Sequence, residues 1–295
     1  MSGEKSIGVM GSGAAAADST TAPAAPATPA AASDAPPMLE VADLHAGYHR
    51  KEIIHGIDFA VQPGEFVCII GANGSGKTTT LKSLLGLIKP FSGSVKINGQ
   101  SISGLSEKKL ARHFAYIPQA HTPPFPFSVA DVVLLGRTPY LNRLAYINPE
   151  DRAIAYNAIC QVGIEDLAKR TYTHLSGGQQ QLVLIARALA QESEVLVMDE
   201  PTASLDFGNQ HAVLTQAKSL VNAGRSVIMV THDPGHAFFC ATRVIIMHEG
   251  RIYADGDPKS VITKDSLRTI YNIDIEVITI PVSDRDHRQV CIPIN

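Results

Sequence analysis

Residues 71–79 read Gly-Ala-Asn-Gly-Ser-Gly-Lys-Thr-Thr and fit the pattern G-x-x-x-x-G-K-[ST]. Glycines let successive backbone N–H groups converge on phosphate oxygens, Lys77 can reach the β- and γ-phosphates, and the Thr78 hydroxyl can ligate Mg²⁺. The apolar run 66–70 before the pattern is typical of a buried parallel strand, and residues 81–87 continue as an amphipathic helix. Because a helix N-terminus also attracts anions, the stretch predicts a phosphate-binding loop rather than an ordinary glycine-serine loop.

Polar residues follow three further predicted strands. The apolar run 195–198 ends in Asp199 and Glu200, where Asp199 is placed to hold Mg²⁺ and Glu200 to act as the general base toward a water. Gln119 follows the strand 114–117 and can direct its amide toward the γ-phosphate, the water or Mg²⁺. His232 follows the strand 227–230 and can bridge the γ-phosphate and Glu200. Taken alone, such a glutamine is usually only solvated and such a histidine usually structural, but ligands bind at this edge of a parallel sheet.

Two weaker candidates lie elsewhere in the chain. Ser176, Gly177, Gly178 and Gln179 open an apolar helix and would present a hydroxyl and free N–H groups to a phosphate. Taken alone, the same residues favour a simple helix cap, since Ser176 and Gln179 also fit a capping box. Tyr48, expected in a polar loop, can stack on an adenine ring, although a hairpin tyrosine without a ligand is the simpler interpretation.

Composition restricts the class of protein. The 295 residues, 45% hydrophobic and 18% charged, are typical of a globular protein of one or two domains. The formal net charge of −3 gives no electrostatic reason to expect nucleic acid as a partner, and no apolar run approaches the ~20 residues of a membrane-spanning helix. The four cysteines are widely separated, which favours buried thiols in a reducing compartment over zinc or a redox pair.

The chain divides by composition into several parts. Residues 1–37 are rich in Ala, Pro, Ser, Thr and Gly, which predicts a disordered tail, whereas residues 38–282 alternate strand and helix patterns. Residues 120–175 carry mainly helical patterns and indicate a helical subdomain inserted into an α/β core. Phe125, Phe127 and residues 136–140 either line a groove for a partner helix or pack onto their own subdomain. The segment after Asp257 contains a predicted helix at 264–271 and a strand at 275–280, with 283–295 as a tail, and its role is not readable from the pattern.

Taken together, these motifs resemble those of an ABC transporter ATP-binding subunit over residues 38–282. The resemblance rests on the Walker A loop, Q-loop, LSGGQ signature, Walker B strand with its glutamate, D-loop and H-loop. In this chain the Walker A loop is Gly71, Ala72, Asn73, Gly74, Ser75, Gly76, Lys77, Thr78 and Thr79, and the Q-loop glutamine is Gln119. The signature is Leu175, Ser176, Gly177, Gly178 and Gln179, and the Walker B strand is residues 195–198 with Asp199 and Glu200. The D-loop is Ser204, Leu205 and Asp206, the H-loop histidine is His232, and Tyr48 belongs to the same set.

The resemblance implies a P-loop NTPase (RecA-like) α/β core with an antiparallel β-subdomain and the inserted helical subdomain. It implies ATP and Mg²⁺ as ligands, Glu200, His232, Gln119 and Lys77 as catalytic residues, and Thr78, Gln119 and Asp199 around the metal. Tyr48, the loop 71–79, residues 176–179 and Asp206 would contact nucleotide. The partners would be a second copy of the chain, transmembrane permease subunits and, indirectly, an extracytoplasmic solute-binding protein, at the cytoplasmic face of the membrane.

Residues 136–140, 175–190 and 231–238 are similar to the branch that imports iron-siderophore, haem, cobalamin and related metal complexes. Leu182 stands where most relatives have arginine. In this respect the chain is similar to some molybdate and tungstate importers, which also have leucine, and this widens the set of cargoes. Another cargo or an exporter is an open alternative. A soluble translation or repair ATPase is disfavoured because the chain has one cassette and no long coiled coil. A non-hydrolysing scaffold is disfavoured because Lys77 and Glu200 are both present.

Overall fold

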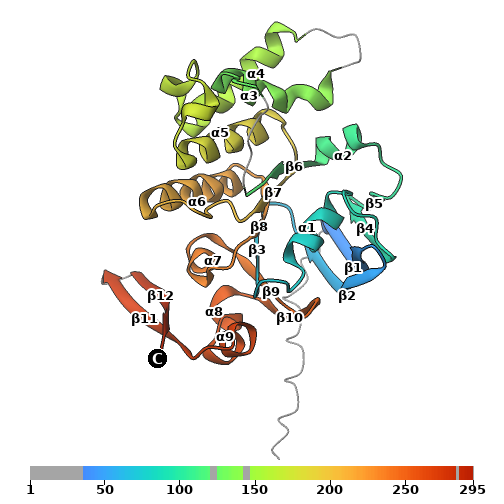
Figure 1. Cartoon of the computed structure of the whole chain (residues 1–295), viewed down its shortest axis with the longest axis vertical. Coiled ribbons are helices and arrows are strands. Elements are labelled where there is room, and N and C mark those ends of the chain that lie inside the picture. Colours follow the sequence, from blue (N-terminus) through green and yellow to red (C-terminus); the bar gives the residue numbers. More distant parts are fainter. Residues whose placement is uncertain (1–35, 120–124, 142–146, 284–285, 295) are drawn as a thin grey trace, which may run out of the picture.

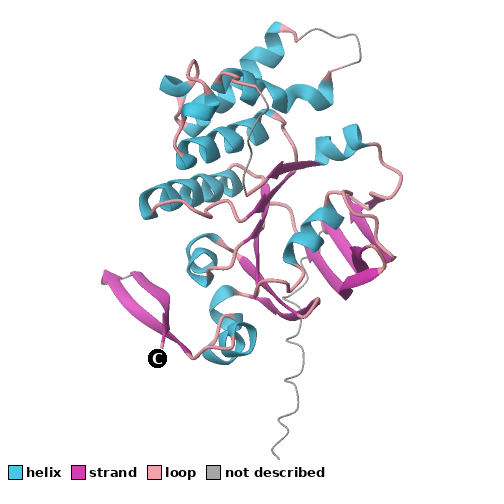
Figure 2. Ribbon diagram, viewed as in Figure 1, coloured by secondary structure: helices cyan, strands magenta, loops and turns pink. Residues whose placement is uncertain are grey.

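The computed structural model describes residues 36–119, 125–141, 147–283 and 286–294. A six-stranded sheet occupies its centre, in the order β10-β9-β3-β8-β7-β6 (Figures 1 and 2). The four pairings from β9 to β6 are parallel, and β10 joins β9 antiparallel. The strands are β3 (Phe66–Ile70), β6 (Phe114–Ile117), β7 (Val195–Asp199), β8 (Ser226–Val230), β9 (Arg243–His248) and β10 (Arg251–Gly256). Every residue of β3, β7 and β8 is buried, as continuous apolar runs predict for strands covered on both faces.

An antiparallel subdomain covers one face of this sheet. Its strands, in the order β2-β1-β4-β5, are β1 (Leu39–Tyr48), β2 (Lys51–Val61), β4 (Ser92–Ile97) and β5 (Gln100–Ser101). Helix α1 (Lys77–Leu84) lies between the two sheets, and its Leu81 and Leu84 share a core cluster with Val67 and Ile69 of β3. The C-terminal end of this helix differs from the prediction. It ends at Leu84 rather than continuing to residue 87, because Gly86 adopts a left-handed conformation (φ 68°).

Helices cover the opposite face of the central sheet (Figure 1). They are α5 (Gly177–Ala190), α6 (Phe207–Asn222), α7 (Pro234–Cys240), α8 (Pro258–Val261) and α9 (Lys264–Tyr271). Side chains alternate along β3, so that Phe66, Cys68 and Ile70 face these helices while Val67 and Ile69 face the antiparallel subdomain. The expected P-loop NTPase fold with an added antiparallel sheet is therefore confirmed.

A helical subdomain extends from one end of the core (Figure 1). It contains α3 (Val129–Leu134), η1 (Leu135–Tyr140), α4 (Pro149–Val162), η2 (Glu165–Leu167) and η3 (Tyr172–His174), and α3 and α4 pack on α5. The helical patterns predicted within residues 120–175 form helices, and α3 and α4 each begin at a capping box, Ser128 with Asp131 and Asn148 with Asp151. Helix α2 (Glu107–His113) precedes β6 and is capped by Ser106. Residues 120–124, at the start of the predicted helical subdomain, lie outside the described residues.

The C-terminal segment is more ordered than the pattern predicted. The sequence predicts a tail at residues 283–295, but β12 (Asp286–Pro293) pairs antiparallel with β11 (Ile275–Ser283) in a hairpin. Val277 and Cys291 of this hairpin pack against the main core cluster, which holds the second strand in place. The predicted tail at 1–37 lies almost wholly outside the described residues. Among the helices that the structure describes, none combines the length and apolarity required to cross a membrane.

Candidate active site

The phosphate-binding loop joins β3 to α1, as predicted. A Cβ on Gly71 would lie 2.3 Å from the Met247 carbonyl oxygen, and one on Gly76 would lie 2.6 Å from the Ile54 side chain. Gly76 also has φ 104°, which L side chains rarely adopt. Only glycine therefore fits at these two positions, where the loop passes close to β9 and β2.

Lys77 is the first residue of α1, and its ammonium group lies inside the loop. It donates hydrogen bonds of 2.8 Å to the Gly71 carbonyl and 2.9 Å to the Ala72 carbonyl. The residue is only 5% exposed, and burial lowers the pKa of Lys77, while Glu200 and Asp199 oppose that shift. The arrangement places a buried cation where the loop is expected to receive the β- and γ-phosphates.

A cavity of about 180 Å³ lies over this loop. It is lined by Ile53, Asn73, Gly74, Gly76, Lys77, Thr78, Thr79 and Glu200. The Ser75 hydroxyl is buried in the same loop and has no hydrogen-bond partner among the described residues. An orphaned buried donor beside a lysine and exposed backbone N–H groups fits a phosphate oxygen as its acceptor. The loop thus fits a nucleotide polyphosphate.

Asp199 ends β7 beside the loop. Its Oδ1 lies 3.4 Å from the Thr78 hydroxyl, and its Oδ2 accepts a hydrogen bond of 3.3 Å from the Tyr116 hydroxyl. Burial raises the pKa of Asp199 and raises the pKa of Tyr116 to about 12. Two hard oxygen donors side by side at a phosphate site fit Mg²⁺, which takes few protein ligands besides phosphates and water. Sequence reasoning missed Tyr116, which lies on β6 beside β7.

Glu200 follows Asp199 and lines the cavity with a side chain 21% exposed. Its backbone has φ 47°, in the left-handed region, and its N–H donates to the Val230 carbonyl of β8 at 3.0 Å. This conformation is uncommon for residues with a Cβ and is held here by the neighbouring strand. It directs the carboxylate toward the loop rather than along β7, which suits a base that accepts a proton from a bound water.

His232 follows β8, and its Nδ1 lies 3.5 Å from Oε2 of Glu200. The imidazole is 59% exposed, so it contacts Glu200 at the open side of the site. His236, four residues further along the chain, is directed elsewhere: its Nδ1 lies 3.0 Å from the Thr231 hydroxyl and its Nε2 lies 3.3 Å from Asp233. The sheet edge therefore brings together Asp199, Glu200 and His232, three of the residues predicted at strand ends, with Lys77 of the phosphate-binding loop.

The remaining candidates lie at varying distances from the cavity. Gln119 is exposed two residues after β6, whose Ile117 pairs with Met198 next to Asp199. Tyr48 belongs to β1, where it pairs with Lys51, instead of the polar loop that was predicted. Its ring is 38% exposed and lies 5.8 Å from the Lys82 ammonium of α1. Tyr48 is thus beside the phosphate-binding helix and open to solvent, as a stacking platform requires.

The signature residues lie apart from the loop within one chain. The Ser176 hydroxyl accepts the Gln179 N–H and Gln179 accepts the Ser176 N–H, so the capping box is formed. A Cβ on Gly178 would lie 2.3 Å from the Asn209 side chain, which places this turn against the start of α6. Asp206 caps that helix by accepting the Asn209 N–H at 2.8 Å. Among the described residues, the structure pairs the signature with the D-loop of its own chain and not with the Lys77 cavity.

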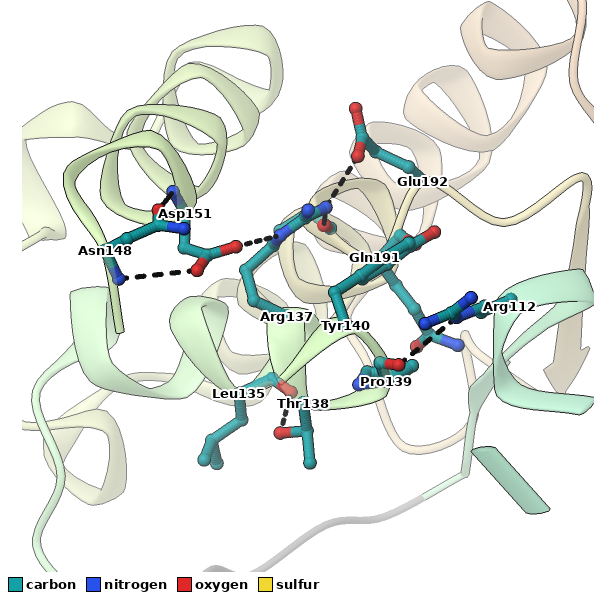
Figure 3. A network of polar contacts seen from close by, with 11 residues as sticks. Arg112, Leu135, Arg137, Thr138, Pro139, Tyr140, Asn148, Asp151, Gln191 and Glu192 are labelled. Atoms are coloured by element: carbon teal, nitrogen blue, oxygen red, sulfur yellow. Dashed lines mark hydrogen bonds and ion pairs between the residues drawn. The ribbon is translucent and has the colours of Figure 1, made fainter. Parts of the chain in front are cut away.

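In the segment 136–140, Gly136, Arg137 and Pro139 are buried and Thr138 is exposed, so the segment packs largely onto its own subdomain (Figure 3). Arg137, 5% exposed, donates to Asp151 at 3.0 Å, to the Ala190 carbonyl at 2.9 Å and to Glu192 at 2.6 Å. Its guanidinium also lies 4.2 Å from the centre of the Tyr140 ring. A buried guanidinium requires several acceptors, and those of Arg137 lie on α4 and at the C-terminal end of α5. The segment therefore connects these two helices.

These features define a P-loop ATPase, and comparison with known proteins specifies the family. The family model of the ABC transporter matches residues 54–203. An uncharacterized ABC transporter ATP-binding protein of Haemophilus influenzae is 42% identical over 82% of this chain and 92% of its own. The hemin import ATP-binding protein HmuV of Nocardia farcinica is 40% identical over 79% of this chain and 80% of its own. A solved metal-chelate type ABC transporter in an inward-facing conformation is 28% identical, with a TM-score of 0.79 over 88% of this chain and 98% of the other.

The chain therefore belongs to the ABC transporter family, as its ATP-binding subunit. It binds ATP and hydrolyses it to drive transport, and the expectation drawn from the motifs is confirmed at this level. Leu182, the departure from the usual signature, is partly buried and packs against the main core cluster. A leucine is thus accommodated on α5 as an apolar contact.

Proposed function

We propose that this subunit powers the import of a metal chelate such as haem or an iron-siderophore complex. The relative from Nocardia farcinica is a hemin importer subunit, and the structural neighbour is of the metal-chelate type. The hydrolytic half of the proposal rests on one observation: Lys77 and Glu200 line one cavity, with His232 3.5 Å from Glu200.

In the proposed reaction, Glu200 accepts a proton from the water that attacks the γ-phosphorus, while the bond from that phosphorus to the β–γ bridging oxygen breaks and ADP leaves. Lys77 stabilises the negative charge on the phosphate oxygens, and the backbone N–H groups of residues 74–78 hold them in line. His232 orients the Glu200 carboxylate and contacts the γ-phosphate. Thr78, Asp199 and Gln119 would hold Mg²⁺, which when bound neutralises phosphate charge.

A complete site is proposed to require two copies of the chain. Ser176, Gly177 and Gly178 lie beside the D-loop of their own chain, so in a head-to-tail homodimer they would face the nucleotide held by the partner copy. The N-terminus of α5 favours negative charge, and the Ser176 hydroxyl remains able to donate while it accepts the Gln179 N–H. Tyr48 would stack on adenine, and Asp206 would lie between the two sites.

The remaining partners follow from the same proposal. Closure of two copies on ATP and reopening after hydrolysis would move two transmembrane permease subunits, which would contact the surface around Gln119 at the cytoplasmic face of the membrane. A solute-binding protein would deliver the cargo on the other side. The cargo itself would not touch this chain, so it cannot select between chelates by its own pockets.

Uptake in cells tests the cargo. A strain that lacks this subunit should lose energy-dependent uptake of iron supplied as haem or siderophore, and the wild-type gene but not Glu200→Gln should restore it. Uptake of labelled molybdate is the matched control, because Leu182 makes the signature of this chain similar to that of some importers of that oxyanion. Loss of molybdate uptake with normal iron uptake would replace the proposed cargo, while leaving the ATPase assignment intact.

A further inference from the structure

The C-terminal segment, whose role the sequence pattern did not reveal, contacts the histidine of the active site. The hydroxyl of Tyr271, the last residue of α9, donates a hydrogen bond of 2.9 Å to the backbone carbonyl of His232. The two residues are 39 positions apart in the sequence. No motif connects them, so the contact is visible only in the fold.

Tyr271 is supplied by a firmly held helix. Within α9, Leu267 is fully buried and Ile270 is 4% exposed, and both belong to the main core cluster. Thr263 and Ser266 form a capping box at the start of this helix, and Asn272 ends it in a left-handed conformation. Ile275, at the start of the hairpin, is 5% exposed and joins the same cluster. Packing on both sides of Tyr271 therefore fixes the position of its hydroxyl.

The hydroxyl is also kept as a hydrogen-bond donor. Burial raises the pKa of Tyr271 well above its ordinary value, the Asp233 carboxylate raises it further, and a hydrogen bond with the backbone of Gly71 partly offsets the rise. The phenol therefore stays protonated over the physiological pH range.

On the strand side, the segment that carries His232 is held by the Thr231 N–H, which donates to the Ile69 carbonyl at 3.2 Å. Asp233 N–H donates to the Thr231 hydroxyl at 3.1 Å, and His236 contacts the same hydroxyl at 3.0 Å. These bonds shape the turn into α7 but leave the His232 side chain largely exposed, with Glu200 as its contact at 3.5 Å. The direction of the imidazole depends on the orientation of the His232 backbone, which Tyr271 holds by the carbonyl.

We propose that Tyr271 is a positioning residue for ATP hydrolysis, which holds the His232 backbone so that the imidazole meets Glu200. The inference rests on the proposed role of His232. It gives the C-terminal segment a function within the catalytic cycle: α9 and the hairpin β11–β12 form a support for the H-loop, in addition to closing the core. Removal of the hydroxyl should leave ATP binding intact and slow the chemical step, because Tyr271 does not line the nucleotide cavity.

The test compares Tyr271→Phe, His232→Ala and the double variant in the full-length chain. Tyr271→Phe keeps the ring and its packing and removes only the donor. We expect kcat to fall about two- to tenfold, as for the loss of one hydrogen bond, with KM for ATP and the melting temperature unchanged. Tyr253→Phe is the matched control, since Tyr253 lies on β10 with its ring edge-on to His248 and should keep the wild-type kcat.

Coupling decides whether Tyr271 acts through His232. Rates of the slow variants are measured by release of labelled phosphate over hours. The double variant should hydrolyse ATP no more slowly than His232→Ala alone, because the residue that Tyr271 positions is already gone. Multiplying losses in the double variant, or a wild-type kcat for Tyr271→Phe, would overturn the inference alone. A His232→Ala variant with the wild-type rate would instead overturn the proposed role of His232 and this inference with it.

Discussion

Arg137 and Asp151 form an ion pair of 3.0 Å in which both side chains are almost fully buried, 6% and 7% exposed. The pair joins η1 to the first turn of α4, and Arg137 also bonds Glu192 after α5 (Figure 3). A buried ion pair is costly to break, because the remaining charge loses its partner without regaining water. The segment 136–140 thus stabilises the helical subdomain.

Arg137→Met should therefore lower the free energy of unfolding by about 3–5 kcal/mol. Lys96→Met is the matched control, since the Lys96–Glu40 pair at 3.2 Å is exposed and should contribute only about 0–1 kcal/mol. Chemical denaturation of both variants measures the difference. A loss below about 1 kcal/mol for Arg137→Met would show that this buried network does not stabilise the fold.

Two histidines should give stability opposite dependences on pH. Burial lowers the pKa of His236 from its ordinary 6.5, so the unfolded chain binds more protons and stability falls as pH drops below 6.5. The hydrogen bond to Glu52 raises the pKa of His45 from the same value, so its stabilisation is present below 6.5 and disappears as pH rises through the raised pKa.

Unfolding measurements at several pH values compare the wild type with His236→Gln and His45→Gln. The advantage of the wild type over His236→Gln should shrink as pH falls from about 7.5 to 5.5, whereas its advantage over His45→Gln should shrink as pH rises over the same range. Differences that change in the same direction for both variants would contradict these pKa shifts.

The strand-end residues were predictable from the sequence, because each follows a short apolar run that can only be a buried parallel strand. The carboxyl ends of such strands meet at one edge, which places Asp199, Glu200 and His232 together beside the loop that carries Lys77. Contacts between side chains distant in sequence were not predictable in this way. Tyr271 reaches His232 from a separate helix, and Arg137 occupies a buried site that its charge argued against.

The signature illustrates a second limit. Ser176 and Gln179 fit both a helix cap and an anion site, and the structure shows the cap without testing the anion site. Both interpretations use the same N–H groups at the start of α5, so one chain cannot separate them. The prediction of a tail at 283–295 was wrong for another reason. The alternation of apolar and polar residues along 287–292 is weak, and the strand forms there by pairing with β11.

Mixing two inactive variants tests the shared site. A Lys77→Ala chain and a Ser176→Arg chain each carry one defect, and in a head-to-tail dimer of the two, one site combines an intact loop with an intact signature. Each mixed dimer should therefore regain about half of the hydrolysis of a wild-type dimer if the two sites act independently, and a 1:1 mixture that pairs at random should regain about a quarter. Mixing Lys77→Ala with Glu200→Gln is the matched control, because both defects lie in the loop-bearing half and no site becomes complete. Absence of recovery in the first mixture would contradict the two-copy site.

ATP hydrolysis by Glu200→Gln, compared with its nucleotide binding, tests most directly whether Glu200 is the general base. The substitution keeps the shape of the side chain at 3.5 Å from His232 and removes its basicity. We predict that ATP binds with unchanged affinity and that the dimer persists, while kcat falls by about 10²-fold or more. Hydrolysis near the wild-type rate by a variant that binds ATP normally would show that Glu200 is not the general base.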